Sequence, residues 1–130
     1  MDMIIHLAGI PSPTYYKKYP FKTYFLNSDL SQIFLDYAKK NRSKFIYFSS
    51  SEIYGNPDKN NIPTKEEYDG RVSSISDRSC YDESKRSGET FSYMYKNYYK
   101  LDVKIIRPFN FFIGISHLPC DDIFPLNIKL

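Results

Sequence analysis

A tyrosine and a lysine stand four residues apart in the stretch SCYDESKR, residues 79–86. Four residues make about one turn of a helix, so Tyr81 and Lys85 would share one helix face. A nearby positive charge favours a phenolate and lowers the pKa of a tyrosine from its ordinary value of about 10. Such a pair would serve as a proton acceptor near neutral pH. This spacing can also arise by chance in a chain with 13 tyrosines and 18 lysines and arginines. Other parts of the sequence must therefore show whether the pair is functional.

The apolar pattern predicts the elements that would position this pair. Short apolar segments, rich in aromatic and β-branched residues, indicate buried parallel strands at about 3–8, 44–50 and 103–107. Apolar residues at three-and-four spacing predict helices at about 23–40 and 79–99. Alternating strands and helices are typical of right-handed βαβ units. We therefore expect an α/β fold, a partial Rossmann-like, doubly wound parallel sheet with three α/β/α layers.

The segments between these elements carry further expectations. Three prolines in residues 11–20 predict a loop there, and the polar stretch 56–78 predicts a long loop. Ser84 and Gly88 share one stripe of the second helix and leave room for close packing. Another helix is expected to begin at about residue 123.

Several polar segments converge on one edge of the predicted sheet. Residues 9–12, 49–52 and 110 follow the three strands, and Tyr81 lies at the N-terminal end of the second helix. Ligands bind beyond the carboxyl ends of the strands in open parallel sheets. This convergence favours a functional role for Tyr81 and Lys85 over chance.

Composition excludes several classes of protein. A chain of 130 residues has the size of one domain, and it contains no apolar run of the ~20 residues that a membrane span needs. A net charge of +3, with lysines scattered among acids, argues against nucleic acid as a partner. Cys80 and Cys120 lack metal-ligand spacing, so no metal site is expected and the thiols fit a reduced, cytoplasmic protein.

Four segments occur in order: HLAGIPSPTYYKKYPFKT, SSSEIYGNP, RSCYDESKR and IIRPFN. Together they resemble the extended short-chain dehydrogenase/reductases of the NAD-dependent epimerase/dehydratase family, which modify nucleotide sugars. The resemblance is greatest to the UDP-glucuronate decarboxylases and covers nearly all of the chain to about residue 110. It implies a tightly bound NAD that oxidises the sugar at C4 and later returns the hydride.

The resemblance also implies roles for individual residues. Tyr81 matches the catalytic base, Lys85 the lysine that supports it and holds the nicotinamide ribose, and Ser50 the partner of the C4 oxygen. Glu52 matches the acid near C5, and the Ser-Glu pair is typical of decarboxylases. Some dehydratases share that pair, so a nucleotide-sugar 4,6-dehydratase or a 4-epimerase remains an alternative.

The remaining matches concern binding. The residues implied to contact NAD, besides Ser49, Tyr81 and Lys85, are Leu7, Ala8, Gly9, Asn27 and Pro108. Those implied to contact the nucleotide sugar are Tyr16, Ser51 and Asn110. His6 is instead interpreted as a packed strand residue.

The family's phosphate-binding motif is absent, because no two of the five glycines are close enough to form GxGxxG. We therefore expect residues 1–130 to be the central and C-terminal part of a Rossmann domain, with substrate-binding residues beginning at about 110. The expected function is UDP-glucuronate decarboxylation to UDP-xylose. A non-catalytic remnant that only dimerises through its two helices remains open, and a homodimer is expected in both cases.

Overall fold

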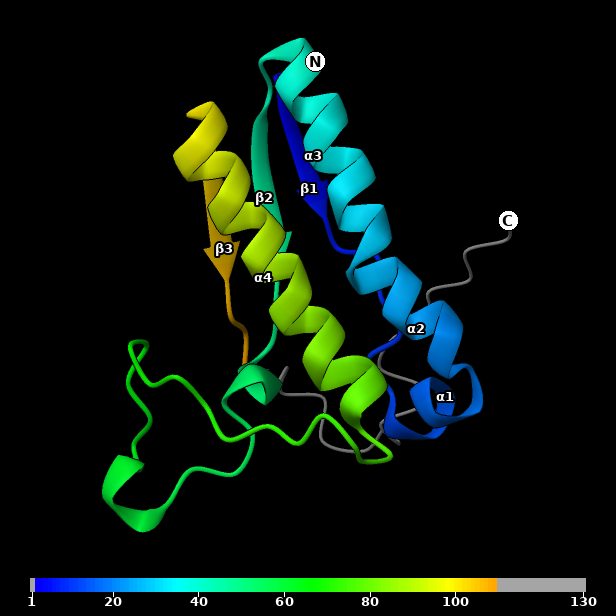
Figure 1. Cartoon of the computed structure of the whole chain (residues 1–130), viewed down its shortest axis with the longest axis vertical. Coiled ribbons are helices and arrows are strands. Elements are labelled where there is room, and N and C mark those ends of the chain that lie inside the picture. The colour runs from blue at the N-terminus through cyan, green and yellow to red at the C-terminus, as the bar shows by residue number, and fades with distance from the viewer. Residues whose placement is uncertain (1, 110–130) are drawn as a thin grey trace, which may run out of the picture.

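The structure, a computed structural model, describes residues 2–109 of the chain. Three strands, β1 (Met3–His6), β2 (Lys44–Phe48) and β3 (Val103–Ile106), form a parallel sheet in the order β1-β2-β3 (Figure 1). The expected strands and their parallel arrangement are therefore confirmed, although each is shorter than predicted. Strands β1 and β3 point toward the end of the molecule at which helix α4 (Ser79–Tyr99) begins (Figure 1).

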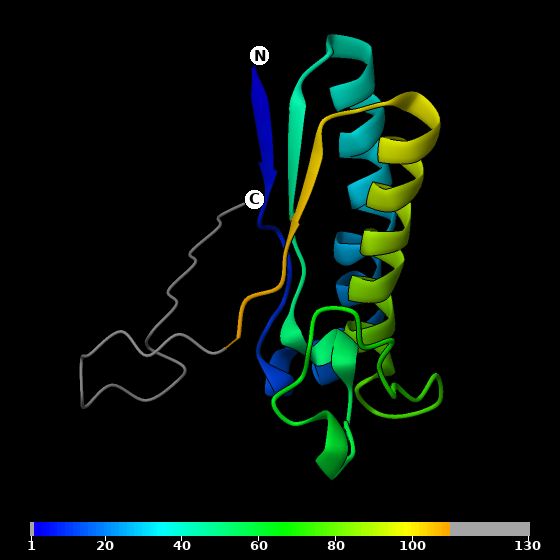
Figure 2. The ribbon, with the colours of Figure 1, turned by 90° about the vertical axis from the view of Figure 1, so that its left-hand side faces the viewer.

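Two long helices, α3 (Asp29–Asn41) and α4 (Ser79–Tyr99), lie against one face of the sheet (Figure 2). Within residues 2–109 the arrangement is thus Rossmann-like, with one helical layer on the sheet. The alternate residues Met3, Ile5 and Leu7 are exposed, whereas His6 between them is buried. The helix expected from residue 123 lies outside the described residues.

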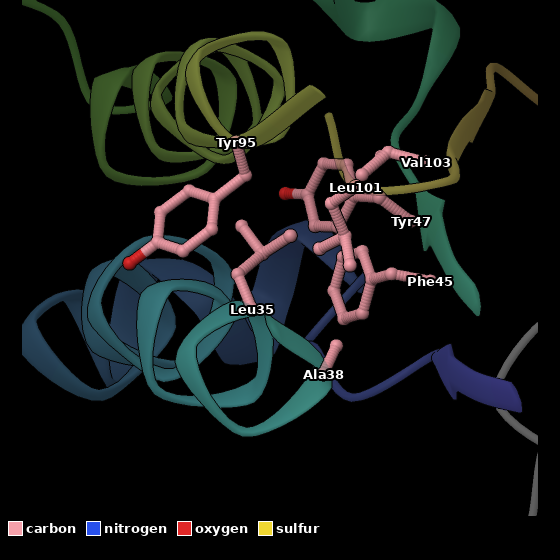
Figure 3. Close-up of a cluster of buried hydrophobic side chains, with 7 residues drawn as sticks. All are labelled: Leu35, Ala38, Phe45, Tyr47, Tyr95, Leu101 and Val103. Atoms are coloured by element: carbon pink, nitrogen blue, oxygen red, sulfur yellow. The ribbon is translucent and has the colours of Figure 1, made fainter. Parts of the chain in front are cut away.

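The core lies between this sheet and its helices. Its buried side chains point toward one another from α3, α4, the strands and the α4–β3 turn (Figure 3). They are Leu35, Ala38, Phe45, Tyr47, Tyr95, Leu101 and Val103. Removal of this apolar surface from water is the main force that fixes α4 on the sheet.

The expected loop at residues 11–20 is wrong. Two helices, α1 (Pro13–Lys18) and α2 (Pro20–Asn27), each begin with proline. Proline suits the first helical position, because the N–H group that it lacks would have no partner within the helix. The helix expected at 23–40 is likewise two helices, since the chain turns at Ser28 between α2 and α3.

The stretch 56–78 is a long loop, as predicted, with a short 3-10 helix η2 (Lys59–Asn61) inside it. A second 3-10 helix, η1 (Ser51–Tyr54), precedes the loop. The Arg86 guanidinium on α4 donates to the carbonyl oxygens of Ile53 (3.0 Å) and Asp69 (2.8 Å). These bonds join η1 and the middle of the loop to α4.

Gly88 sets the depth at which α4 packs, as its predicted packing stripe requires. A Cβ atom at this position would lie 2.2 Å from Tyr47 Oη and 2.6 Å from the Asn27 carbonyl oxygen. Tyr47 Oη donates to that same oxygen at 3.1 Å. Any side chain here would push α4 away from β2 and α2.

We predict that Gly88→Ala destabilises the chain by about 2 kcal/mol, although alanine is the better helix former, because neither backbone nor buried ring can yield. Chemical denaturation checks this, with Thr90→Ala at an exposed position of the same helix as the control. Equal stability of the Gly88→Ala variant and the wild type would contradict the prediction.

Candidate active site

Tyr81 lies in the first turn of α4 and is buried. Its ring stacks on that of Tyr16 from α1, with centroids 5.1 Å apart and an interplanar angle of 17°. Tyr16 is only 1% exposed, and its hydroxyl has no hydrogen-bond partner among the described residues. The stack therefore fixes the plane of the Tyr81 phenol.

Lys85 lies one turn further along α4 and is also buried. Its Nζ donates to the Phe48 carbonyl oxygen at 2.7 Å and lies 5.8 Å from the centroid of the Tyr81 ring. Burial lowers the pKa of this ammonium group to about 8. The group thus joins α4 to the end of β2 on the same side as the phenol, as the spacing of the pair predicts.

The expected lowering of the Tyr81 pKa is wrong. Burial raises the pKa, a hydrogen bond with Ser50 lowers it, and the charges of Glu52 and Asp82 raise it again. Desolvation favours the neutral phenol, and the Lys85 ammonium is bound to a carbonyl instead of the phenol oxygen. The structure does place Ser50 beside Tyr81, as the family resemblance implies.

Gly9, Asn27 and Lys85 meet at the end of β1. A Cβ atom on Gly9 would lie 2.9 Å from Asn27 Oδ1 and 3.6 Å from Lys85 Nζ. The Asn27 amide donates to Ser84 Oγ at 3.1 Å, whereas its Oδ1 is buried without a partner among residues 2–109. An orphaned acceptor beside a side-chain-free glycine fits residues that hold a polar cofactor.

The serines after β2 are tied to the segment after β3. Backbone N–H groups of Ser49 and Ser51 donate to the carbonyl oxygens of Ile106 (2.8 Å) and Pro108 (3.0 Å). Ser50 Oγ accepts from the Glu52 N–H at 3.2 Å and so caps η1. These bonds bring Ser49, Ser50, Ser51 and Pro108 to the edge where Tyr81 lies.

Glu52 projects from η1 and forms an ion pair with Arg78, a residue that the sequence interpretation missed. Arg78 Nε also lies 3.5 Å from Oδ2 of the buried Asp82. Arg78 and Asp82 are four residues apart in the sequence, on either side of Tyr81. This spacing predicts an ion pair on one helix face and could have identified Arg78.

Other predicted residues are less tightly placed. Leu7 is 62% exposed and Ala8 is half-buried. Asn110 lies outside the described residues. The binding roles of these residues, and that of Tyr16 toward a sugar, stay predictions.

His6 is a packed strand residue, as interpreted. Its Nε2 lies 3.2 Å from the Leu26 carbonyl oxygen, and its ring contacts Phe34 edge-on. Burial and the nearby Lys85 charge lower its pKa to about 4. Between about pH 6.5 and pH 4 the unfolded chain therefore binds a proton that the folded chain does not.

We predict that acid destabilises the wild type more than His6→Gln, whose amide can still donate to Leu26 but does not titrate. Between pH 6.5 and 4.5 the free energy of unfolding of the wild type should fall by about 2 kcal/mol more. Denaturant titrations across this range check the difference. Parallel losses of stability in the two proteins would show that His6 is not the group responsible.

No helix within the described part of the chain is long and apolar enough to cross a membrane. Nor do residues 2–109 place three or more His, Cys, Asp or Glu side chains where they could hold a metal ion.

A comparison with models of protein families identifies the family of the chain. The model of the NAD dependent epimerase/dehydratase family matches residues 1–113. The chain belongs to this family. Members of this family are NAD-dependent enzymes.

Curated relatives include two proteins named UDP-glucuronic acid decarboxylase 1. The one from Arabidopsis thaliana is 42% identical over 110 residues, which are 85% of this chain and 25% of the relative. The one from Xenopus tropicalis is 39% identical over 118 residues, 91% of this chain and 28% of the relative. The chain therefore spans about a quarter of the length of these relatives.

Solved structures agree on the fold. RMD from Pseudomonas aeruginosa, complexed with NADPH, superposes with a TM-score of 0.72 at 27% identity, covering 84% of this chain and 35% of that one. Pal from Bacillus thuringiensis gives a TM-score of 0.71 at 26% identity, covering 85% of this chain and 33% of that one. These matches confirm the Rossmann-like fold.

Proposed function

We propose that this chain carries the catalytic part of an NAD-dependent enzyme that converts UDP-glucuronate to UDP-xylose through a 4-keto intermediate. The observation that carries the proposal is one cluster at the end of the sheet. It contains the buried Tyr81 phenol, its hydrogen-bond partner Ser50, the Lys85 ammonium, and the Glu52 carboxylate within electrostatic range. The similarity to two decarboxylases supports this reaction over others of the family.

Bound NAD would supply the acceptor, and later the donor, of a hydride. Lys85, Asn27 and Gly9 are the residues that would hold it, because an ammonium group and an unpaired amide oxygen lie beside a glycine without a side chain. The loop residues Ser49 and Pro108 border the same edge.

Tyr81 takes the proton of the sugar's C4 hydroxyl in this proposal, and Ser50 shares the C4 oxygen. Because burial raises the pKa of the phenol, it needs a positive charge nearby to become an acceptor. Lys85, with a pKa of about 8, carries that charge at neutral pH. The stacked Tyr16 ring prevents the phenol from turning away.

Glu52 separates decarboxylation from simple redox chemistry at C4. Once C4 is a ketone, the C5 carboxylate belongs to a β-keto acid. The bond from C5 to the carboxyl carbon breaks, CO₂ leaves, and its electron pair moves to the ketone oxygen as an enolate. C5 then takes up a proton, and Glu52 is the group proposed to position the sugar or deliver that proton.

To test these roles we define a chimaera in which residues 1–113 replace the matching segment of the Arabidopsis thaliana relative. Tyr81→Phe in this chimaera keeps the ring and its stack but removes the proton acceptor. Hydride transfer should fall by about 10²- to 10⁴-fold, the loss typical of a general base, as followed by NADH absorbance in single turnover. Unchanged transfer would exclude Tyr81 as the base.

Glu52→Gln in the chimaera keeps the side chain's shape and removes its charge. It should slow CO₂ release more than C4 oxidation, so a 4-keto nucleotide sugar should accumulate and be trapped by borohydride reduction. Thr64→Ala, in the loop beyond η1, serves as the control. Normal CO₂ release by Glu52→Gln would refute the role of Glu52, and 4-epimerisation of a neutral UDP-hexose would favour an epimerase.

We also propose that the chain forms a homodimer through α3 and α4, where exposed apolar residues include Ile33, Tyr37 and Tyr93. Twofold dimers, in which both copies use the same face, are the commonest homo-oligomers. Sedimentation velocity should show a dimer for the wild type, a monomer for Tyr37→Asp, and a dimer for Ile75→Asp in the exposed loop. A wild-type monomer at high concentration would exclude the pairing.

A further inference from the structure

Three arginines hold consecutive residues of η1, the 3-10 helix that presents Glu52 to the site. Arg78 pairs with the Glu52 carboxylate, Arg86 Nη1 donates to the Ile53 carbonyl oxygen at 3.0 Å, and Arg107 Nη1 donates to Tyr54 Oη at 3.0 Å. Of these three arginines, only Arg78 binds the Glu52 carboxylate itself. Arg86 and Arg107 hold the turn as a scaffold, and Arg78 holds its carboxylate.

Arg78 is fixed from a second side by Asp82. Its Nε lies 3.5 Å from Asp82 Oδ2, and Asp82 is buried, with Oδ1 lacking a partner among the described residues. Burial raises the pKa of that carboxyl and the Arg78 charge lowers it. Asp82 therefore needs the guanidinium as its counter-ion, which limits where the guanidinium can lie.

The two acids also indicate what Arg78 does not do. One guanidinium between two carboxylates leaves the cluster with a formal charge of −1 when all three groups are ionised. A substrate carboxylate would have to displace Glu52 to gain a bidentate contact with Arg78. The arrangement therefore favours an arginine that serves the protein's own carboxylate.

The Glu52 carboxylate lies close enough to Tyr81 and Tyr16 for its charge to act on both phenols. Its charge raises the pKa of both Tyr81 and Tyr16, whose rings stack on each other. Both Glu52 and Arg78 side chains are 43% exposed, so without its partner the glutamate could turn into solvent. The Glu52 side chain would therefore lose its orientation if the contact with Arg78 were removed.

We infer that Arg78 is a positioning residue, which holds the Glu52 carboxylate beside Tyr81 and acts on the reaction only through it. This inference rests on the proposed function for its kinetic consequence. The contact itself belongs to the 130-residue chain and is tested there first.

The first test is NMR of the 130-residue chain with ¹⁵N-labelled arginine. The Nε–H signal of Arg78 should be resolved, with slow rotation of the guanidinium, and both Glu52→Gln and Asp82→Asn should speed that rotation. Arg86 should be unaffected by Glu52→Gln. An Arg78 signal that does not respond to Glu52→Gln would overturn the inference, whatever reaction the complete enzyme catalyses.

The second test is a double-mutant cycle in the chimaera, with rates of CO₂ release as readout. Arg78→Gln should lower the rate by about 10- to 100-fold with little change in KM, as expected for a misplaced group, and Arg78→Lys should restore part of it. In the Glu52→Gln background, Arg78→Gln should lower the rate of CO₂ release by less than a further twofold. Thr64→Ala, the control outside η1, should leave the rate unchanged in both backgrounds.

The outcomes separate the two claims. Losses from Arg78→Gln and Glu52→Gln that multiply, or a loss confined to KM, would overturn positioning and indicate direct contact of Arg78 with substrate. A chimaera that oxidises C4 but releases no CO₂ would refute the proposed decarboxylation, and the NMR test would still decide the Arg78–Glu52 contact.

Discussion

The close approach of α4 to β2 at Gly88 is the constraint on which the rest of the site depends. Tyr47 Oη occupies the space that a Cβ would fill and donates to the Asn27 carbonyl oxygen, so α2, β2 and α4 meet there without a spacer. That depth lets Lys85, one turn before Gly88, reach the carbonyl at the end of β2. It also places Tyr81 against Tyr16 on α1. A helix held farther out would separate the phenol from the serine at the strand end.

Much of this arrangement could be predicted because it follows from periodic patterns. The apolar strands, the parallel sheet and the common side of Tyr81, Lys85 and Ser50 all follow from spacing and from the rule that parallel strands end at one edge. The prolines at positions 13 and 20 misled because their effect depends on whether they fall inside a helix or at its first residue. Sequence alone does not show whether a proline lies inside a helix or at its first residue.

Electrostatics was the least predictable part. Spacing on a helix brings a lysine near a tyrosine but does not reveal burial, and burial raises the pKa of Tyr81 while it lowers that of Lys85. The partner of Glu52 comes from a segment 26 residues away, across a loop without periodic pattern. Such a contact depends on how that loop folds back onto α4.

The central proposal is that NAD bound at this edge of the sheet would take a hydride from C4 of the sugar and return it to the same carbon. The most direct measurement uses UDP-glucuronate deuterated at C4, turned over by the chimaera and analysed by mass spectrometry and NMR. The account predicts that the product UDP-xylose keeps deuterium at C4, that turnover shows a primary isotope effect, and that solvent hydrogen enters only at C5. Release of CO₂ without an isotope effect at C4, or loss of the label to solvent, would contradict it.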